Sequence, residues 1–282
     1  MIINDGLNEK FDKEYQRGLS GLNIGLPMPF TRLSAEVCGI QQGTYYLIGG
    51  STGSGKSTLA QEIFITNPIQ HCNSAKTPFK AHIEYFNLEI KDVNVLAKMI
   101  CNWIYKASDF NVKISVNKVF QKGSNVLTDL EKEWIEKAKP YREFLLKNCN
   151  FIAGERISKE YIYKRLWECA RTYGILEKDP KTGKDLLHTY KPKDPNQFII
   201  LVFDNVNNLN EKALIDEVSK YFVDFRNYCN FTFVVVQQYN RSIEGMDRRR
   251  EFLKPQLSDL KETSKPADDC DIALLTFAPK RF

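Results

Sequence analysis

Five short apolar runs recur along the chain, and each is bounded by polar residues or glycine. Their hydrophobic positions are nearly continuous rather than alternating, which is typical of strands that are buried on both faces of a parallel sheet. The runs span residues 44–50, 81–90, 198–203, 231–244 and 271–278, and the apolar part of the fourth run ends at Gln237 and Gln238. The pattern therefore predicts an α/β fold built on a mostly parallel, twisted sheet.

Helical periodicity appears directly after the first of these runs. Leu59, Ile63 and Phe64 are spaced to lie on one face of a helix over residues 57–67. Residues 5–19 could form a short amphipathic helix or remain a frayed terminus. Helices between the strands are what a parallel sheet requires for its crossovers.

The composition is that of a globular protein with a real core. Hydrophobic residues make up 43% and charged residues 27% of the 282 residues. No apolar run reaches the roughly 18 residues of a membrane-spanning helix, and the polar N-terminal segment is unlike a signal peptide. Seven scattered cysteines without a CxxC pair predict free thiols in a reducing compartment. We therefore expect a cytoplasmic protein without membrane association.

The chemistry begins with a glycine-rich loop. Residues 50–57 read Gly-Ser-Thr-Gly-Ser-Gly-Lys-Ser, which fits the pattern G-x-x-x-x-G-K-[ST], with a strand before it and a helix after it. Glycines let successive backbone N–H groups turn toward phosphate oxygens, and a helix N-terminus attracts negative charge. The alternative is a flexible Gly/Ser turn that matches by chance, but such a turn needs no such flanks. We therefore predict ATP binding by Gly50, Ser51, Thr52, Gly53, Ser54, Gly55, Lys56, Ser57 and Thr58.

Roles within this loop follow from the side chains. Lys56 can reach the β- and γ-phosphates, and the hydroxyl of Ser57 can ligate Mg²⁺. Asp204 ends the run 198–203, so it lies at the carboxyl end of a predicted strand, where parallel sheets carry their ligand sites. An ordinary strand-end aspartate in a turn is the plain alternative, but beside the glycine loop a metal-holding role is favoured.

A carboxylate that could activate water follows the predicted strand at 81–90. Glu89 stands just beyond the apolar part of this strand, whereas Glu84 lies inside it and is the weaker candidate. Glu89 could equally be a solvated residue that opens the next helix. From spacing alone, both interpretations of Glu89 remain open.

Amides and basic residues follow the fourth run. Gln237 or Gln238 could hydrogen-bond a γ-phosphate and sense its loss, or could simply begin a polar loop. The basic residues behind them are Arg241, Arg248, Arg249, Arg250 and Lys254, which could grip nucleic-acid phosphates. A solvated surface is the more common role of such a charge run, and the net charge of +5 permits a polyanionic partner without establishing one.

Taken in order, these segments resemble the ATPase domain of DnaB-type replicative helicases, within the RecA-like superfamily. FNLEI at 86–90 is similar to the family's FSLEM, and VVVQQYNRSIE at 234–244 to its ALSQLNRSVE. LSDLKETSKPADDCDIALL at 257–275 is similar to LSDLRESGAIEQDADVVL. The resemblance covers most of the chain, and three such matches beside the glycine loop are far more specific than any one of them.

The resemblance implies particular roles and partners. It implies that Glu89 is the general base and that the γ-phosphate sensor is Gln238 rather than Gln237. It also implies a ring, usually of six subunits, with ATP between neighbours and single-stranded DNA held by the loops after Asp204 and Gln238. A primase or helicase loader would be a further partner, and the cell would be bacterial or phage-infected.

Other segments fit the family or depart from it. Residues 127–138 look like a family helix, 150–155 like a strand and 158–174 like the next helix, in which Ser158 is a plausible N-cap before an apolar stripe of Ile162, Leu166 and Cys169. Residues 175–197 look like an inserted charged loop, either a surface hairpin or a mobile arm. Lys261 and Asp268 stand where the family has Arg and Gln.

The last residues bear on the rate of hydrolysis. In the family, the final strand leads to a hairpin whose Lys-x-Arg pair acts as an arginine finger in the neighbouring site. Here the sequence ends FAPKRF at 277–282, and Lys280 and Arg281 match that pair poorly. Because a trans-acting arginine contributes roughly 10³ to 10⁵ in rate, we expect weak hydrolysis by this chain alone, or a chain that continues further in the full protein.

The sequence thus predicts an N-terminal linker segment at 1–20 and a RecA-like ATPase domain at 21–282. The predicted function is that of a helicase motor, which hydrolyses ATP with Mg²⁺ to move along single-stranded DNA during replication. Two alternatives stay open: a RecA-like recombinase, and a scaffold or regulatory protein that binds ATP without translocating.

Overall fold

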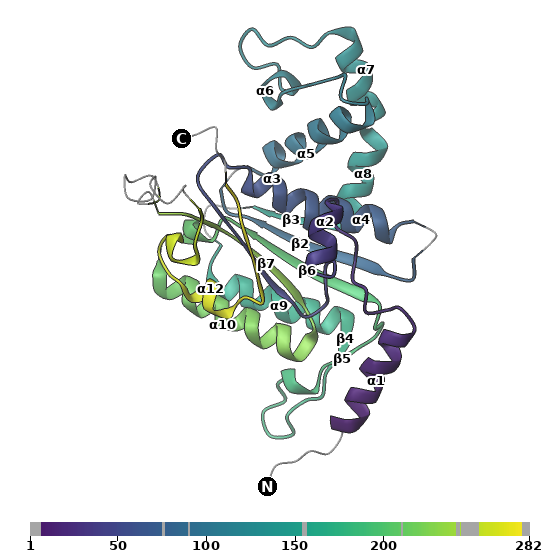
Figure 1. Cartoon of the computed structure of the whole chain (residues 1–282), viewed down its shortest axis with the longest axis vertical. Coiled ribbons are helices and arrows are strands. Elements are labelled where there is room, and N and C mark those ends of the chain that lie inside the picture. Colours follow the sequence, from purple (N-terminus) through teal and green to yellow (C-terminus); the bar gives the residue numbers. More distant parts are fainter. Residues whose placement is uncertain are drawn as a thin grey trace.

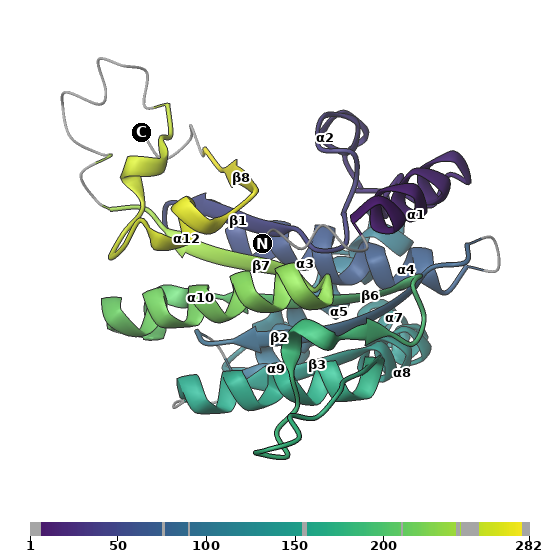
Figure 2. The ribbon, with the colours of Figure 1, turned by 90° about the horizontal axis from the view of Figure 1, so that it is seen from below.

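A six-stranded sheet forms the centre of the molecule. The computed structural model describes residues 7–74, 77–89, 91–153, 157–209, 211–240, 243 and 254–277, with the side chain of Lys10 left aside. The sheet has the order β3-β2-β6-β7-β1-β8, and every neighbouring pair within it is parallel. Its strands are β1 (Tyr45–Gly50), β2 (Lys80–Asn87), β3 (Cys149–Ala153), β6 (Gln197–Asp204), β7 (Thr232–Gln238) and β8 (Ile272–Leu275). The predicted parallel sheet is confirmed, and Figure 2 shows β8 toward one edge and β3 toward the other.

Helices cover both faces of this sheet. One face packs on α3 (Lys56–Gln61), the π-helical turn η1 (Glu62–Thr66), α4 (Asn67–Cys72), α5 (Asp92–Ala107) and α8 (Lys139–Asn148). The other face packs on α9 (Lys159–Tyr173), α10 (Lys212–Cys229) and α12 (Lys265–Asp269). The strands are buried almost end to end because both of their faces carry apolar side chains.

Two groups of elements extend beyond the sheet at opposite ends of the molecule (Figure 1). At one end, α6 (Val116–Val119) and α7 (Asp129–Lys137) pack against α5 over a small apolar core. Thr128 and Glu131 form a capping box that fixes the start of α7. At the other end lie α1 (Leu7–Leu19) and the antiparallel pair β4 (Gly174–Ile175) and β5 (Lys191–Pro192).

Several local predictions are confirmed with adjusted boundaries. The segment 5–19 is helical as α1 rather than frayed, and the inserted charged segment is a hairpin that β4 and β5 close. Ser158 caps α9, since its side chain accepts a hydrogen bond from the N–H of Tyr161 (3.2 Å). The remaining short helices are α2 (Thr31–Glu36) and the 3₁₀ turns η2 (Leu187–Thr189), η3 (Val206–Leu209) and η5 (Leu257–Asp259).

Two predictions were too long. The strand expected over 81–90 ends at Asn87, so Glu89 lies beyond the ladder. The single helix expected over 57–67 changes to a π-helical turn after Gln61 and then continues as α4. No helix in the part of the chain that the structure describes is long and apolar enough to cross a membrane.

The seven cysteines are free thiols, as predicted. Cys38 is exposed, and it follows α2. The other six are buried or half-buried, and burial raises the pKa of their thiols, to about 11 for Cys101 and Cys270 and to about 12 for Cys72.

Candidate nucleotide site

The glycine-rich loop joins β1 to α3 at the carboxyl edge of the sheet. Gly53 and Gly55 have positive φ angles (73° and 90°), a conformation that side chains with a Cβ rarely adopt. Gly50 has no room for a Cβ, which would lie closer than 3.0 Å to the side chains of Ser54, Lys56 and Thr276. The sequence pattern therefore has a steric basis, because the loop closes tightly on itself and on the end of β8.

The end of β8 supports this loop. The hydroxyls of Ser54 and Thr276 are hydrogen-bonded to each other (2.9 Å), and Thr276 also donates to the carbonyl of Gly49 (3.0 Å). The backbone N–H of Ser54 donates to the carbonyl of Ser51 (3.1 Å). Thr276 was not predicted as a site residue, because its contact with the loop arises from sheet order and not from local sequence.

Lys56 opens α3 and is buried, with 6% of its surface exposed. Its Nζ donates to the carbonyl of Ser51 (2.9 Å), so the ammonium group is held over the loop rather than extended into solvent. Ser57 and Thr58 follow in the first turn and are half-buried, whereas Thr52 is exposed. The predicted phosphate-binding residues therefore surround a single loop at a helix N-terminus.

Ser57 and Asp204 are 147 residues apart in the sequence and meet in the structure. The hydroxyl of Ser57 donates to Oδ1 of Asp204 (2.9 Å), and Asp204, the last residue of β6, is only 3% exposed. Burial raises the pKa of Asp204, and hydrogen bonds from Tyr85 and Ser57 only partly offset this effect. A hydroxyl beside a buried carboxylate fits Mg²⁺, which prefers hard oxygen ligands.

Glu89 lies beside Asp204, as an exposed residue just after β2. Its N–H donates to the side chain of Asn87 (3.3 Å), and the N–H of the preceding Leu88 donates to the carbonyl of Asp204 (2.7 Å). The charge of Glu89 contributes to the raised pKa of Asp204. The second carboxylate considered on this strand, Glu84, is fully buried on the face that packs against α9 and is not at the carboxyl edge.

The two adjacent glutamines at the end of β7 have different environments. Gln237 is fully buried, and its amide donates to the carbonyls of Lys261 (2.6 Å) and Thr263 (2.9 Å). Gln238 is half-buried, and its backbone is held by Asn207 (2.7 Å) and by the N–H of Lys261 (2.8 Å). The side chain of Gln237 thus anchors the segment around Lys261, and Gln238 remains the predicted sensor.

The predicted DNA-binding residues are mostly outside the described part of the chain. Arg241, Arg248, Arg249 and Arg250 all belong to this group. Lys254 is described and is exposed on the segment that leads into η5. DNA binding by these residues therefore stays a prediction.

A cavity of about 810 Å³ borders the phosphate loop on the side of α5. Ser54 and Thr58 form its inner wall, and aromatic side chains form much of the rest. These aromatic residues are Phe30, Tyr105, Phe110 and Phe277. A mostly apolar cavity of this size next to a phosphate loop is suited to a planar base and its sugar.

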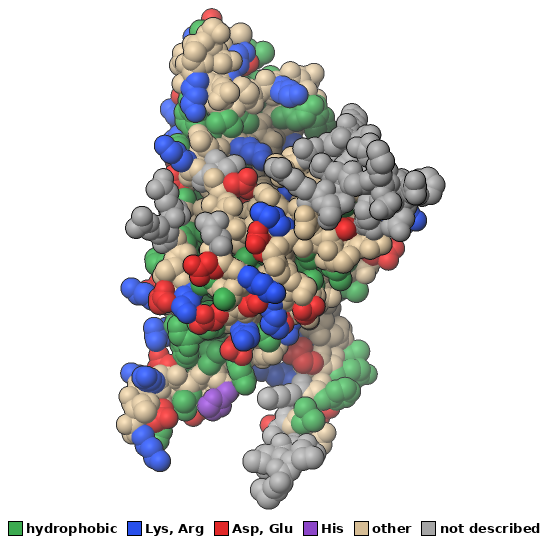
Figure 3. All heavy atoms as spheres, turned by 90° about the vertical axis from the view of Figure 1, so that its left-hand side faces the viewer, with side chains coloured by type: hydrophobic (Ala, Val, Ile, Leu, Met, Phe, Trp, Pro, Cys, Tyr) green, Lys and Arg blue, Asp and Glu red, His purple; other side chains and the backbone are tan. Residues whose placement is uncertain are grey.

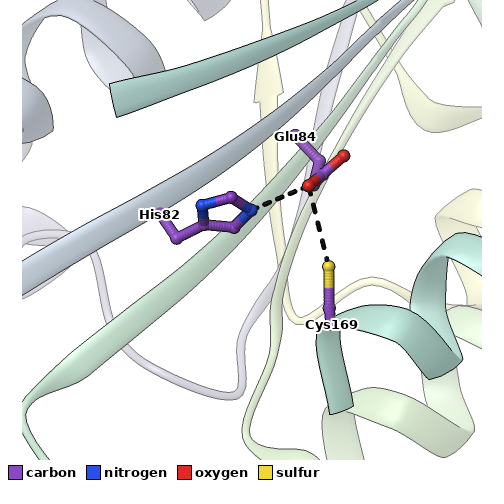
Figure 4. A group of neighbouring side chains, drawn as sticks. All are labelled: His82, Glu84 and Cys169. Carbon is purple, nitrogen blue, oxygen red and sulfur yellow. Dashed lines mark hydrogen bonds and ion pairs between the residues drawn. The ribbon is translucent and has the colours of Figure 1, made fainter. Parts of the chain in front are cut away.

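A second polar cluster lies on the opposite face of β2 (Figure 4). The side chains of His82, Glu84 and Cys169 have ligand atoms within 4.8 Å of one another, although the latter two are buried. Arg165 donates to both oxygens of Glu84 (2.7 and 2.8 Å), and Asn150 donates to Oε1 (2.8 Å). The carboxylate is therefore already neutralised and saturated, so the cluster is an internal ion pair rather than a metal site.

The ion pair explains the ionisation of this buried acid. Burial alone would raise the pKa of Glu84, but hydrogen bonds from His82, Arg165 and Asn150 outweigh it and hold the pKa below its ordinary value. The group fastens α9 to β2, since Arg165 and Cys169 come from the helix. Sequence analysis missed it because its members come from separate elements.

A parallel sheet with a phosphate loop after β1 and an acidic residue at the end of β6 defines a RecA-like P-loop fold. A scan against protein-family models and a search of curated proteins both find no match. Among the solved structures that share the fold, one is the ATPase domain of a phage helicase. It aligns over 98% of this chain and 84% of its own, with a TM-score of 0.70 and 17% identity.

Another solved structure is described as "The Structure Of A DnaB-Like Replicative Helicase And Its Interactions With Primase". It aligns with 100% of this chain, with a TM-score of 0.65 and 17% identity, but this chain spans only 57% of its length. The predicted resemblance to the DnaB-type ATPase domain is thus confirmed at the level of the fold.

Proposed function

We propose that this chain is the ATP-hydrolysing motor domain of a DnaB-like DNA helicase. The observation that carries the proposal is the 2.9 Å hydrogen bond between Ser57 and the buried Asp204. It joins the phosphate loop to the end of β6, at the place where the fold brings metal-bound triphosphate and acidic residues together. The fold and the sequence motifs of the preceding sections support it.

The residues have distinct tasks in this proposal. Lys56 and the N–H groups of the loop bind the phosphate oxygens. Ser57 and Asp204 would hold Mg²⁺, which supplies charge neutralisation on the phosphates when it is bound. Glu89 orients a water molecule and accepts its proton, because its exposed carboxylate lies beyond the buried Asp204. The cavity lined by Tyr105 and Phe110 takes the nucleoside.

The contacts of β7 provide a route from the phosphate to the DNA. Gln238 contacts the γ-phosphate, and its backbone is tied to Asn207 and to Lys261. The amide of Gln237 holds the carbonyl of the same Lys261. Movement of Gln238 after hydrolysis is therefore passed to the segment that follows, which includes Lys254 and the predicted DNA-binding arginines.

The test is ATP turnover with and without single-stranded DNA. We expect DNA to raise the turnover number several-fold, and we expect the stimulation to fall steeply with added salt because phosphate contacts release counterions. The phosphate release of the full chain, measured over a range of oligonucleotide concentrations, checks this.

Three other results would point elsewhere. Tight ATP binding without DNA stimulation would favour a scaffold or regulatory protein. Strand exchange on open filaments would favour a recombinase. Absence of nucleotide binding would overturn the proposal altogether.

We further propose that copies of this chain assemble through α1. Leu7, Phe11, Tyr15 and Leu19 recur every fourth residue and are 56–70% exposed, so they form an apolar stripe on one side of the helix. Figure 3 shows hydrophobic side chains gathered on α1, at the lower right. An apolar groove between α5, α6 and α7 is lined by Leu96, Ile100 and Phe120 and offers a surface of the same chemistry on a second copy.

A charge placed in this stripe should weaken assembly. We expect Phe11→Asp to shift the protein toward smaller species by at least an order of magnitude in concentration, because a buried unpaired carboxylate costs several kcal/mol (about 3–5). Sedimentation velocity with a non-hydrolysable ATP analogue measures this. Gln16→Asp adds the same charge on the polar side of α1 and should assemble normally. Equal assembly of the two variants would remove α1 from the interface.

A further inference from the structure

A line of hydrogen-bonded polar side chains runs beneath the phosphate loop. The amide nitrogen of Gln61 donates to the hydroxyl oxygen of Tyr85 (2.9 Å), and that hydroxyl donates to Oδ2 of Asp204 (2.8 Å). The side chains come from α3, β2 and β6. Gln61 is 4%, Tyr85 0% and Asp204 3% exposed, so water does not compete for these bonds.

The direction of each hydrogen bond is fixed by donor count. Tyr85 has one hydroxyl hydrogen, and an ionised Asp204 has none to give. The hydrogen of Tyr85 must therefore point to Asp204, and Gln61 must present its N–H₂ group to the phenolic oxygen. The amide oxygen of Gln61 is left buried without a protein partner, which shows that the orientation is held at a cost.

Both oxygens of Asp204 are consequently held by separate donors. Oδ1 accepts from Ser57 and Oδ2 accepts from Tyr85. Ser57 and Gln61 are four residues apart and lie on the same face of α3, so one helix face controls both ends of the carboxylate. The helix widens into a π-helical turn directly after Gln61, a departure that is frequent at functional sites.

We propose that Tyr85, held by Gln61, is a positioning residue that fixes the Asp204 carboxylate for the divalent cation that accompanies ATP. The inference rests on the proposed function, since it assigns the cation to Ser57 and Asp204. Without the Tyr85 hydroxyl, Oδ2 would be buried without this donor. The carboxylate would then turn toward other donors and lose its alignment with Ser57. The ring of Tyr85 packs in the core and is not needed for this effect.

Tyr85→Phe removes the hydroxyl and keeps the ring. We expect the affinity for the Mn²⁺ complex of a non-hydrolysable ATP analogue to fall about 10-fold, as is typical when a partner of a metal ligand is lost. The electron paramagnetic resonance signal of free Mn²⁺ measures this without turnover. In the hydrolysis assay, we expect the half-saturating Mg²⁺ concentration to rise by a similar factor, while excess Mg²⁺ restores most of the turnover number.

Tyr46→Phe is the matched control. Tyr46 is also fully buried in the same core, but its hydroxyl contacts the backbone of Gly39 (3.2 Å) and Gln41 (2.9 Å), away from Asp204. Its loss should leave the metal dependence within about twofold of wild type. Gln61→Met removes the donor to Tyr85 at similar volume and should shift the metal dependence in the same direction as Tyr85→Phe, which keeps the test decisive if one variant folds poorly.

The outcomes separate this inference from the proposed function. Weaker Mn²⁺ binding in both site variants, with a normal control, supports the positioning role even if the wild-type chain hydrolyses ATP slowly. Unchanged metal dependence in Tyr85→Phe and Gln61→Met, in a protein that binds the metal–nucleotide complex, overturns the inference alone. No binding by wild type overturns both.

Discussion

Glu89→Gln is expected to lower ATP turnover by about 10²- to 10⁴-fold, the range that a positioned general base contributes. The amide keeps the size of the side chain but cannot accept the proton of the attacking water. ATP affinity should change little, because Glu89 is exposed and lies outside the phosphate loop. Single-turnover hydrolysis and equilibrium binding of a fluorescent ATP analogue together measure the two effects.

Glu84→Gln on the same strand is the discriminating control. Glu84 is fully buried and paired with Arg165, so the change should leave an uncompensated guanidinium group and lower the free energy of unfolding by about 3–5 kcal/mol. The turnover of the folded fraction should stay near wild type. If Glu84→Gln removes hydrolysis selectively and Glu89→Gln does not, the assignment of the base is wrong.

Lys56→Ala is expected to reduce turnover by about 10²- to 10³-fold, the usual effect of losing one group aimed at developing charge. Unlike Glu89→Gln, it should also weaken ATP binding, because Lys56 binds the phosphates in the ground state as well. Isothermal titration with ATP and with ADP shows whether the loss is concentrated on the terminal phosphates.

Lys80→Ala provides the comparison for charge alone. Lys80 is an exposed lysine at the start of β2, at the opposite edge of the sheet, where it pairs with Asp194. A surface pair of this kind contributes about 0–1 kcal/mol, so both ATP binding and turnover should be retained. Retained turnover in Lys56→Ala would show that the loop does not bind a triphosphate.

The sheet and the phosphate loop were predictable because they are written in short, local patterns. Continuous apolar runs identified the strands, and glycine spacing identified a loop whose tightness the structure explains at Gly50 and Gly55. The position of Asp204 followed from the rule that ligands gather at the carboxyl ends of parallel strands. These inferences needed no knowledge of which strands are neighbours.

The rest of the site depends on distant contacts. Tyr85 is one aromatic residue among several in an apolar strand, and its partners Gln61 and Asp204 are 24 and 119 residues away. Thr276 reaches the loop only because β8 pairs with β1. Nothing in the local sequence separates such residues from ordinary core or surface residues.

Two misjudged boundaries have the same origin. The helical pattern after the loop gave no sign of the π-helical turn at Glu62–Thr66, because a helix widens in response to what its side chains contact. The strand β2 stops at Asn87, whose side chain accepts a hydrogen bond from the backbone of Glu89 and turns the chain out of the ladder. The amphipathic stripe of α10, by contrast, was present in the sequence and was overlooked.

The thiols of this protein differ enough to serve as a tool. Maleimide dyes react with thiolates, which form at neutral pH where a cysteine is accessible and its ionisation is not suppressed. Cys38 is exposed, whereas burial suppresses ionisation of the other six. A single fluorophore can therefore be attached to the unmodified chain just ahead of β1, where it would report by energy transfer on the distance between labelled copies as nucleotide is exchanged.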